Sequence, residues 1–206
     1  MKPRIIAGEH RGRRLFVPKE EIRPTADRTK ESLFSTLESI LARVRPAAAV
    51  GSSEIWAGIR VIDFCAGTGA LGLEALSRGA AWATFVDAAP ACVAVIRRNL
   101  TLCDLGARAR VLHADARRPP VLDPEATILF VDPPYDLDLD LVTILHAIAR
   151  SRNPVGDAVL AVEHRRTVAL PDTLSTWERL RERRFGETQV TLFGSGVYRP
   201  GADVAE

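Results

Sequence analysis

The chain has 206 residues, of which 47% are apolar and 26% charged, the composition of an ordinary globular protein. No run approaches the roughly 20 apolar residues of a membrane span, and the first residues lack the apolar core of a signal peptide. Cys65, Cys92 and Cys103 form no CxxC pair, so we expect reduced thiols in a cytoplasmic protein without a metal site.

The net charge of +2 conceals a basic N-terminus. Residues 1–30 hold nine Lys or Arg against four Asp or Glu, a net of +5, so the other residues sum to −3. Of the 28 cationic residues, 25 are arginine, which suits bidentate phosphate contacts. This asymmetry favours nucleic acid as a partner, although a solvated basic tail would have the same composition.

The first third of the chain predicts a hairpin, a helix and a connector. Residues 4–18 are expected to form two short strands around a turn, and apolar residues recur at helical spacing from Asp27 to Val44. Residues 45–58 are rich in Pro, Gly, Ser and Ala and predict a flexible connector. We therefore divide the chain into an N-terminal extension, 1–58, and a second domain, 59–206.

From residue 60 onwards, predicted strands and helices alternate. The strands are expected at 60–64, 83–87, 109–115, 127–132 and 158–164, and the helices at 70–78, 90–102 and 137–150. This alternation is typical of an α/β fold, a Rossmann-like parallel sheet with helices on both faces. The segments on either side of Gly186 predict a final antiparallel hairpin at the sheet edge.

Acidic residues stand at the carboxyl ends of the first four of these strands, the edge where such sheets bind ligands. They are Asp63, Asp87, Asp115 and Asp132. Between the first two lies "GTGALG", a GxGxxG turn that contains Gly67, Gly69 and Gly72. Asp87 follows Gly67 by twenty residues, which is the spacing of a dinucleotide-binding fingerprint. The pattern therefore predicts an adenosine-containing ligand.

Asp63, just before the turn, favours S-adenosylmethionine over a nicotinamide dinucleotide. Its carboxylate would be a poor neighbour for a pyrophosphate and a good one for an ammonium group. S-adenosylmethionine carries an ammonium, a carboxylate and a sulfonium but no phosphate. The expected cofactor-binding residues are Asp63, Ala66, Gly67, Gly69, Asp87, Ala88, Asp115 and Ala116.

The predicted strand 127–132 runs into "DPPY", a stiff turn made of Asp132, Pro133, Pro134 and Tyr135. Prolines have a fixed φ and no N–H, so the Asp132 carboxylate and the carbonyl between the prolines stay in place as acceptors. The Tyr135 ring offers a stacking surface for a base. We expect these four catalytic residues to hold the amino group of a guanine or adenine in line with the methyl donor, so that positioning supplies most of the rate.

Four stretches of the chain resemble the RsmD family, bacterial methyltransferases that make N2-methylguanine in 16S ribosomal RNA. They are "RIIAGEHRGRRL", "RPTADRTKESLF", "DFCAGTGALGLEALSRGA" and "VDPPY". The resemblance implies a class I methyltransferase fold with S-adenosylmethionine as donor. It also implies 16S ribosomal RNA, or a small-subunit assembly intermediate, as partner. A monomer without a membrane partner is the default expectation.

The basic N-terminal residues are then expected to contact RNA phosphates beside the target base. They are Arg4, Arg11, Arg13, Arg14, Arg23, Arg28 and Lys30. Three alternatives stay open. A DNA adenine-N6 methyltransferase would use the same "DPPY" pocket, a nicotinamide-dependent oxidoreductase would use the GxGxxG turn, and a non-catalytic RNA-binding protein would keep only the fold.

Overall fold

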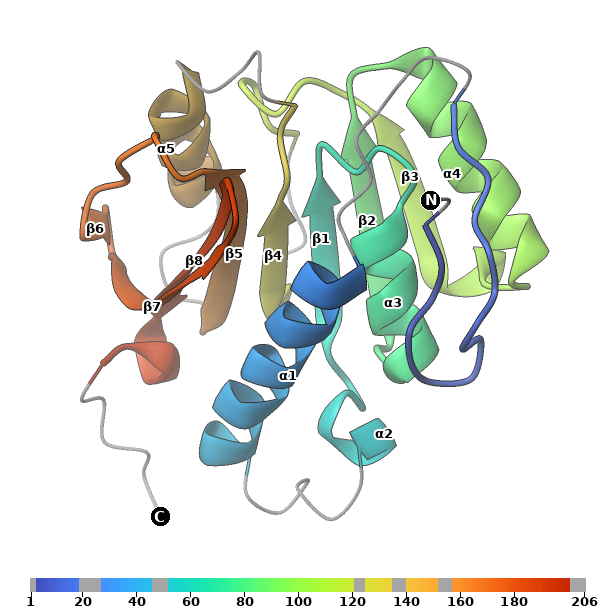
Figure 1. Cartoon of the computed structure of the whole chain (residues 1–206), viewed down its shortest axis with the longest axis horizontal. Coiled ribbons are helices and arrows are strands. Elements are labelled where there is room, and N and C mark those ends of the chain that lie inside the picture. Colours follow the sequence, from blue (N-terminus) through green and yellow to red (C-terminus); the bar gives the residue numbers. More distant parts are fainter. Residues whose placement is uncertain are drawn as a thin grey trace.

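The computed structural model describes residues 3–18, 27–45, 52–120, 125–134, 140–151 and 157–200. An eight-stranded sheet runs through them in the order β3-β2-β1-β4-β5-β8-β7-β6 (Figure 1). Its strands are β1 Arg60–Phe64, β2 Trp82–Asp87, β3 Ala109–His113, β4 Ile128–Val131, β5 Ala158–Arg165, β6 Thr173–Leu174, β7 Trp177–Phe185 and β8 Thr188–Ser195. The first five are parallel, β8 is antiparallel to β5, and β7 and β8 form a hairpin. The predicted α/β fold with a final antiparallel hairpin is confirmed.

Helices cover both faces of this sheet. They are α1 Asp27–Val44, α2 Ser52–Ile55, α3 Ala70–Arg78, α4 Pro90–Leu102 and α5 Leu141–Ser151. Apolar residues of α1, α3 and α4 share one buried cluster with one face of the sheet, whereas α5 belongs to a second cluster with the other face. None of the described helices is long and apolar enough to cross a bilayer.

Residues 3–18, the N-terminal arm, do not form the two predicted strands. The arm folds back on itself through backbone hydrogen bonds between its two halves, but these give only an isolated bridge, between Arg4 and Arg14, and no regular strands. The reason is that the N–H groups of Ile6 and Ala7 donate to the carboxylate of Glu74 on α3, not to a facing strand. Figure 1 shows the arm in dark blue against α3 and α4.

The prediction of a flexible connector over 45–58 is wrong for its second half, while residues 46–51 lie outside the described residues. Trp56 is completely buried, and its indole N–H donates to Glu38 at 3.0 Å. The Arg45 guanidinium donates to the carbonyls of Ile55 and Ala57 at 3.0 and 2.8 Å. The Trp56 bond joins the end of the connector to α1, and the Arg45 bonds join its two ends to each other.

The N-terminal extension and the remainder of the chain share a hydrophobic core. Ile5 and Leu15 of the arm and Leu37 of α1 lie in the same buried cluster as Leu73 of α3 and Phe85 of β2. The extension therefore packs as part of the main body. The domain boundary at residue 58 stays a prediction.

Candidate active site

The four acidic residues converge at one edge of the sheet. Their strands are neighbours in the order β3-β2-β1-β4 and run in parallel, so their carboxyl ends meet. The negative charges of the four carboxylates all act on Cys65, which follows β1. Burial, and then the charges of the four carboxylates, raise the pKa of the Cys65 thiol to about 12. The thiol is therefore protonated near neutral pH and does not serve as a nucleophile.

The glycine turn is held by two of these acids. Asp87 ends β2, and its two carboxylate oxygens accept the N–H groups of Gly67 and Ala89, each at 2.8 Å. Asp63 lies in β1, and its Oδ2 accepts the N–H of Gly72 at 2.9 Å. Both carboxylates thus fix backbone on either side of the turn, and each oxygen keeps further lone pairs for a ligand.

Two glycines are required by the shape of the turn and of the helix that follows it. Gly69 has φ +78°, in the left-handed region that side chains disfavour. A Cβ on Gly72 would stand 2.3 Å from the Phe85 ring, so this glycine lets α3 pack closely on β2. Ala66 is also buried, and its carbonyl accepts the Gly69 N–H at 2.7 Å.

Asp63 is the most deeply buried of the four acids, with 1% of its surface exposed. Burial raises its pKa well above the ordinary carboxyl value. The Gly72 N–H opposes this rise, and the neighbouring charges of Asp132 and Asp87 add to it. A cation at this edge would reverse the effect because it would stabilise the ionised carboxylate. The site therefore favours a ligand that carries a positive charge.

Asp115 is half-exposed, and its carboxylate already pairs with the Arg117 guanidinium. It follows β3, which ends at His113 and not at residue 115 as predicted. Hydrogen bonds from the Arg117 side chain, and then from the Arg117 N–H, lower the pKa of Asp115. Ala116 beside it is buried, whereas Ala88 after β2 is exposed. The predicted cofactor residues thus lie along three neighbouring strand ends.

Asp132 directly follows β4, which ends at Val131. Its backbone N–H makes a long hydrogen bond of 3.4 Å to the Phe64 carbonyl, and the pairing of β4 with β1 ends there. Asp132 is half-buried, Pro133 buried and Pro134 exposed, so the stiff turn rises from the sheet edge towards solvent. Tyr135, the fourth predicted catalytic residue, lies outside the described residues.

Glu163 on β5 is an acid that the sequence analysis missed. Val131 pairs with Val162, so Asp132 and Glu163 are the next residues on adjacent parallel strands. Glu163 follows Ala161 by two residues, which places both side chains on the face that α1 covers. It is half-buried. An acid inside an apolar strand, "AVLAVEH", was the sequence signal.

The predicted RNA-binding residues fall into three groups. Arg11, Arg13, Arg14 and Arg28 are exposed, and Arg4 pairs with Asp27 at 2.7 Å while more than half of its side chain stays exposed. Arg23 lies outside the described residues. Lys30 is 1% exposed, and its ammonium is 3.3 Å from Glu74. The prediction that Lys30 contacts RNA is wrong because its charge is used inside the fold.

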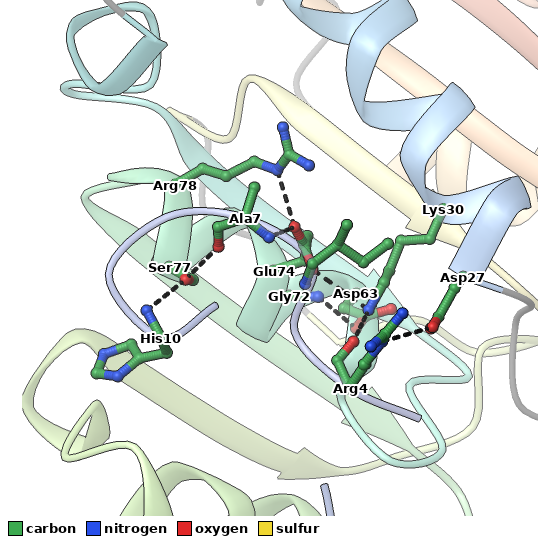
Figure 2. Close-up of polar contacts among 11 residues, drawn as sticks. Arg4, Ala7, His10, Asp27, Lys30, Asp63, Gly72, Glu74, Ser77 and Arg78 are labelled. Carbon is green, nitrogen blue, oxygen red and sulfur yellow. Dashed lines mark hydrogen bonds and ion pairs between the residues drawn. The ribbon is translucent and has the colours of Figure 1, made fainter. Parts of the chain in front are cut away.

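The carboxylate of Glu74 anchors the arm to the helix that follows the glycine turn (Figure 2). It is fully buried and accepts the N–H groups of Ile6 and Ala7 at 2.7 and 3.0 Å. Lys30 and Arg78 supply the positive charges that a buried carboxylate requires. The signal in the sequence was an acid among the apolar residues of α3.

A second anchor joins the arm to the glycine turn itself. The buried Asn99 of α4 exchanges hydrogen bonds with the backbone of Phe16, at 2.8 and 3.1 Å. The same amide group donates to the Thr68 carbonyl at 2.9 Å. Because Thr68 lies between Gly67 and Gly69, the basic arm and the predicted cofactor loop share one fixed frame.

Comparison with known proteins gives a consistent result over nearly the whole chain. The family model described as "Conserved hypothetical protein 95" matches residues 3–194. "Ribosomal RNA small subunit methyltransferase D" of Escherichia coli K12 is 33% identical over 194 residues, 92% of this chain and 88% of that protein. The Haemophilus influenzae protein of the same name is 32% identical, covering 92% of each chain.

A solved structure agrees with these relatives. The structure of yhhF from Escherichia coli superposes with a TM-score of 0.75 at 30% identity, over 95% of this chain and 98% of that one. A more distant neighbour, the mitomycin 7-O-methyltransferase MmcR, has a TM-score of 0.54 at 18% identity and shows the fold alone. The chain is therefore a methyltransferase with a class I fold, and it belongs to the RsmD family that its sequence motifs predicted.

Proposed function

We propose that this protein transfers a methyl group from S-adenosylmethionine to the exocyclic N2 of a guanine in 16S ribosomal RNA, in the cytoplasm. The observation that carries the proposal is the convergence of Asp63, Asp87, Asp115 and Asp132 around one glycine turn. Two relatives named as ribosomal RNA small subunit methyltransferases support the choice of substrate. The substrate is the free RNA or the small ribosomal subunit during assembly.

The residues at the sheet edge fit S-adenosylmethionine. In this proposal Asp63 would bind its ammonium group, Asp87 the ribose hydroxyls and Asp115 the adenine end. Gly67 and Gly69 bring backbone close to the ligand, because neither has a side chain in the way. When bound, the cofactor supplies a methyl group on a positively charged sulfur. The four carboxylates form a negative edge that favours such a ligand.

Asp132 and the Pro133 carbonyl would orient the target amino group. They would accept hydrogen bonds from its two N–H groups and direct the nitrogen lone pair towards the methyl group. Two acceptors also draw the nitrogen from planar towards tetrahedral geometry, which localises a lone pair that is otherwise spread into the ring. Since the proton is lost after the attack, positioning and electrostatics replace a strong general base.

Glu163 favours guanine over adenine as the target. Guanine presents N1–H and N2–H as adjacent donors, whereas adenine presents an amino group beside the N1 acceptor. Asp132 and Glu163 lie next to one another on neighbouring strands and together offer carboxylate acceptors without a donor. Such a pair matches the guanine edge and repels N1 of adenine. This favours the RNA guanine reaction over the DNA adenine-N6 alternative.

Methyl transfer from labelled S-adenosylmethionine tests the function directly. We expect N2-methylguanosine from unmethylated small subunits or naked 16S ribosomal RNA, identified by mass after digestion to nucleosides. Duplex DNA is the matched alternative substrate. N6-methyladenine from that duplex would overturn the proposed base. Tight binding of NAD without binding of S-adenosylhomocysteine would overturn the proposed cofactor.

The raised pKa of Asp63 predicts a pH-dependent affinity for S-adenosylhomocysteine, which keeps the ammonium group. In the free protein Asp63 is protonated up to a pH well above the ordinary carboxyl range near about 4. Ionised Asp63 attracts the ammonium, so affinity rises with pH through that pKa, by at most about tenfold per unit, and then levels off. Calorimetry from about pH 4 up to the highest pH at which the protein stays folded measures this.

Asp63→Asn is the control for this pH dependence. The amide oxygen keeps an acceptor for the Gly72 N–H but does not titrate. Its affinity is expected to be weaker and flat with pH over the same range. A flat profile in the unaltered protein would show that Asp63 does not face the ammonium.

A further inference from the structure

Strand β7 carries four arginines, of which two are paired with an acidic side chain and two are not. Arg179 pairs with Glu182 at 2.8 Å, and Arg184 approaches the same carboxylate at 3.5 Å. Arg181 and Arg183 are exposed, and within the part of the chain that the structure describes their side chains take part in no hydrogen bond or ion pair. Two fixed positive charges are therefore left open to a partner.

These two arginines line a small pocket between β7 and α1. Ser32 and Thr36 of α1 and the Phe185 ring line it too, and β8 forms its apolar floor. We call Arg181, Arg183, Phe185 and Ser32 the β7 surface. Arg28 lies one turn before Ser32 on α1 and is also exposed, so the positive charge continues along the helix. Guanidinium groups beside an aromatic ring suit a phosphate and its nucleoside.

The strand register places the β7 surface in line with the active site. Arg183 pairs with Val190 of β8, Val190 pairs with Glu163 of β5, and Glu163 is level with Asp132. Three strand spacings separate Arg183 from Asp132, which corresponds to about 14 Å across the sheet. Because β7 runs in the same direction as β4, Arg183 and Phe185 also lie towards the carboxyl edge.

The β7 surface and the N-terminal arm lie on opposite sides of β1 and β4, and the turn of the arm contacts the last residues of α3 and α4, away from the carboxyl edge. The arm packs on α3 and α4, which cover β2 and β3, whereas β7 is three strands beyond β4 in the other direction. Figure 1 shows this arrangement, with the arm to the right of β1 and the β7–β8 hairpin to its left. An RNA strand whose target base enters at Asp132 and which continues towards β7 would therefore pass the β7 surface, on the side away from the arm.

We propose that the β7 surface is a second RNA contact, which binds the phosphate backbone on the far side of the target base from the N-terminal arm. The inference rests on the proposed function, because the polyanion that it fits is the RNA substrate. Neighbouring residues of one β face are about 6.6 Å apart along a strand, so Arg181 and Arg183 reach different phosphates. The β7 surface then holds the strand on the side of the base away from the arm.

The test is the salt dependence of binding to unmethylated 16S ribosomal RNA by Arg181→Gln/Arg183→Gln. Loss of two phosphate contacts is expected to weaken binding roughly tenfold at about 0.15 M salt. The slope of log affinity against log salt is expected to become shallower by about 1.4–1.8. S-adenosylhomocysteine affinity is expected to stay the same. Arg181→Lys/Arg183→Lys keeps both charges and is expected to restore the slope.

Arg43→Gln/Arg110→Gln is the matched control. Both residues are exposed arginines, Arg43 at the last turn of α1 and Arg110 near the start of β3, away from the carboxyl edge. The inference is overturned if this control lowers the slope as much as the β7 variant, or if the β7 variant keeps the original slope. If the slopes behave as expected but no methyl reaches the RNA, the proposed function fails and the RNA contact stands.

Discussion

Asp132→Ala is expected to slow methyl transfer to RNA by about 10²–10⁴-fold, with cofactor affinity nearly unchanged. The carboxylate follows β4 directly, and its charge reaches both Asp63 and Cys65. It therefore lies where the reacting nitrogen and the methyl donor would meet. Alanine removes an acceptor from the amino group without disturbing the Asp63 and Asp87 bonds to the glycine turn. Single-turnover transfer measures the loss.

Two variants separate the role of Asp132 from a general effect on the site. Asp132→Asn keeps an acceptor oxygen and loses the charge, so an intermediate rate would divide the effect between geometry and electrostatics. Asp115→Ala, at the opposite end of the row of acids, is expected to weaken S-adenosylhomocysteine binding more than the rate of transfer. A large loss of cofactor affinity in Asp132→Ala would contradict the role assigned to it.

The fold and the row of acids were predicted well from the sequence, because apolar spacing marks the helices and strands, and an acid at the end of a strand is visible in the sequence. The helix Asp27–Val44 begins and ends where its apolar spacing indicates, as do Ala70–Arg78 and Pro90–Leu102. The acids were found because parallel strands bring their carboxyl ends to one edge. The strand predictions at 109–115 and 127–132 were too long, since both strands stop short of the acid that follows.

Contacts between distant segments could not be predicted in this way. Lys30 was assigned to RNA together with the other basic residues of the N-terminal segment, yet its partner Glu74 is 44 positions away in the sequence. Asn99 joins Phe16 to Thr68, and neither partner is marked by periodicity or spacing. Glu163 becomes informative only when the register sets it beside Asp132. Each of these residues required the tertiary structure.

The anchored arm leads to the second prediction with a large effect, on Glu74→Ala. This change removes one partner of a fully buried ion pair and leaves the Lys30 ammonium and two backbone N–H groups in a dry site. The expected loss is about 3–5 kcal/mol in the free energy of unfolding, because an uncompensated buried charge is costly. Denaturant unfolding, followed by circular dichroism, measures it.

Glu31→Ala is the matched control for this change, since Glu31 is an exposed acid on α1 next to Lys30. Its free energy of unfolding is expected to stay within about 0.5 kcal/mol of that of the unaltered protein. Glu74→Gln/Lys30→Met removes both charges and keeps amide and apolar volume. It is expected to be more stable than Glu74→Ala because no buried charge is left unpaired. Burial of Lys30 lowers its pKa even with Glu74 present, which shows how strongly this site disfavours an isolated ammonium. If the free energy of unfolding of Glu74→Ala stays within about 0.5 kcal/mol of that of the unaltered protein, as for a surface substitution, the arm is not held by this carboxylate.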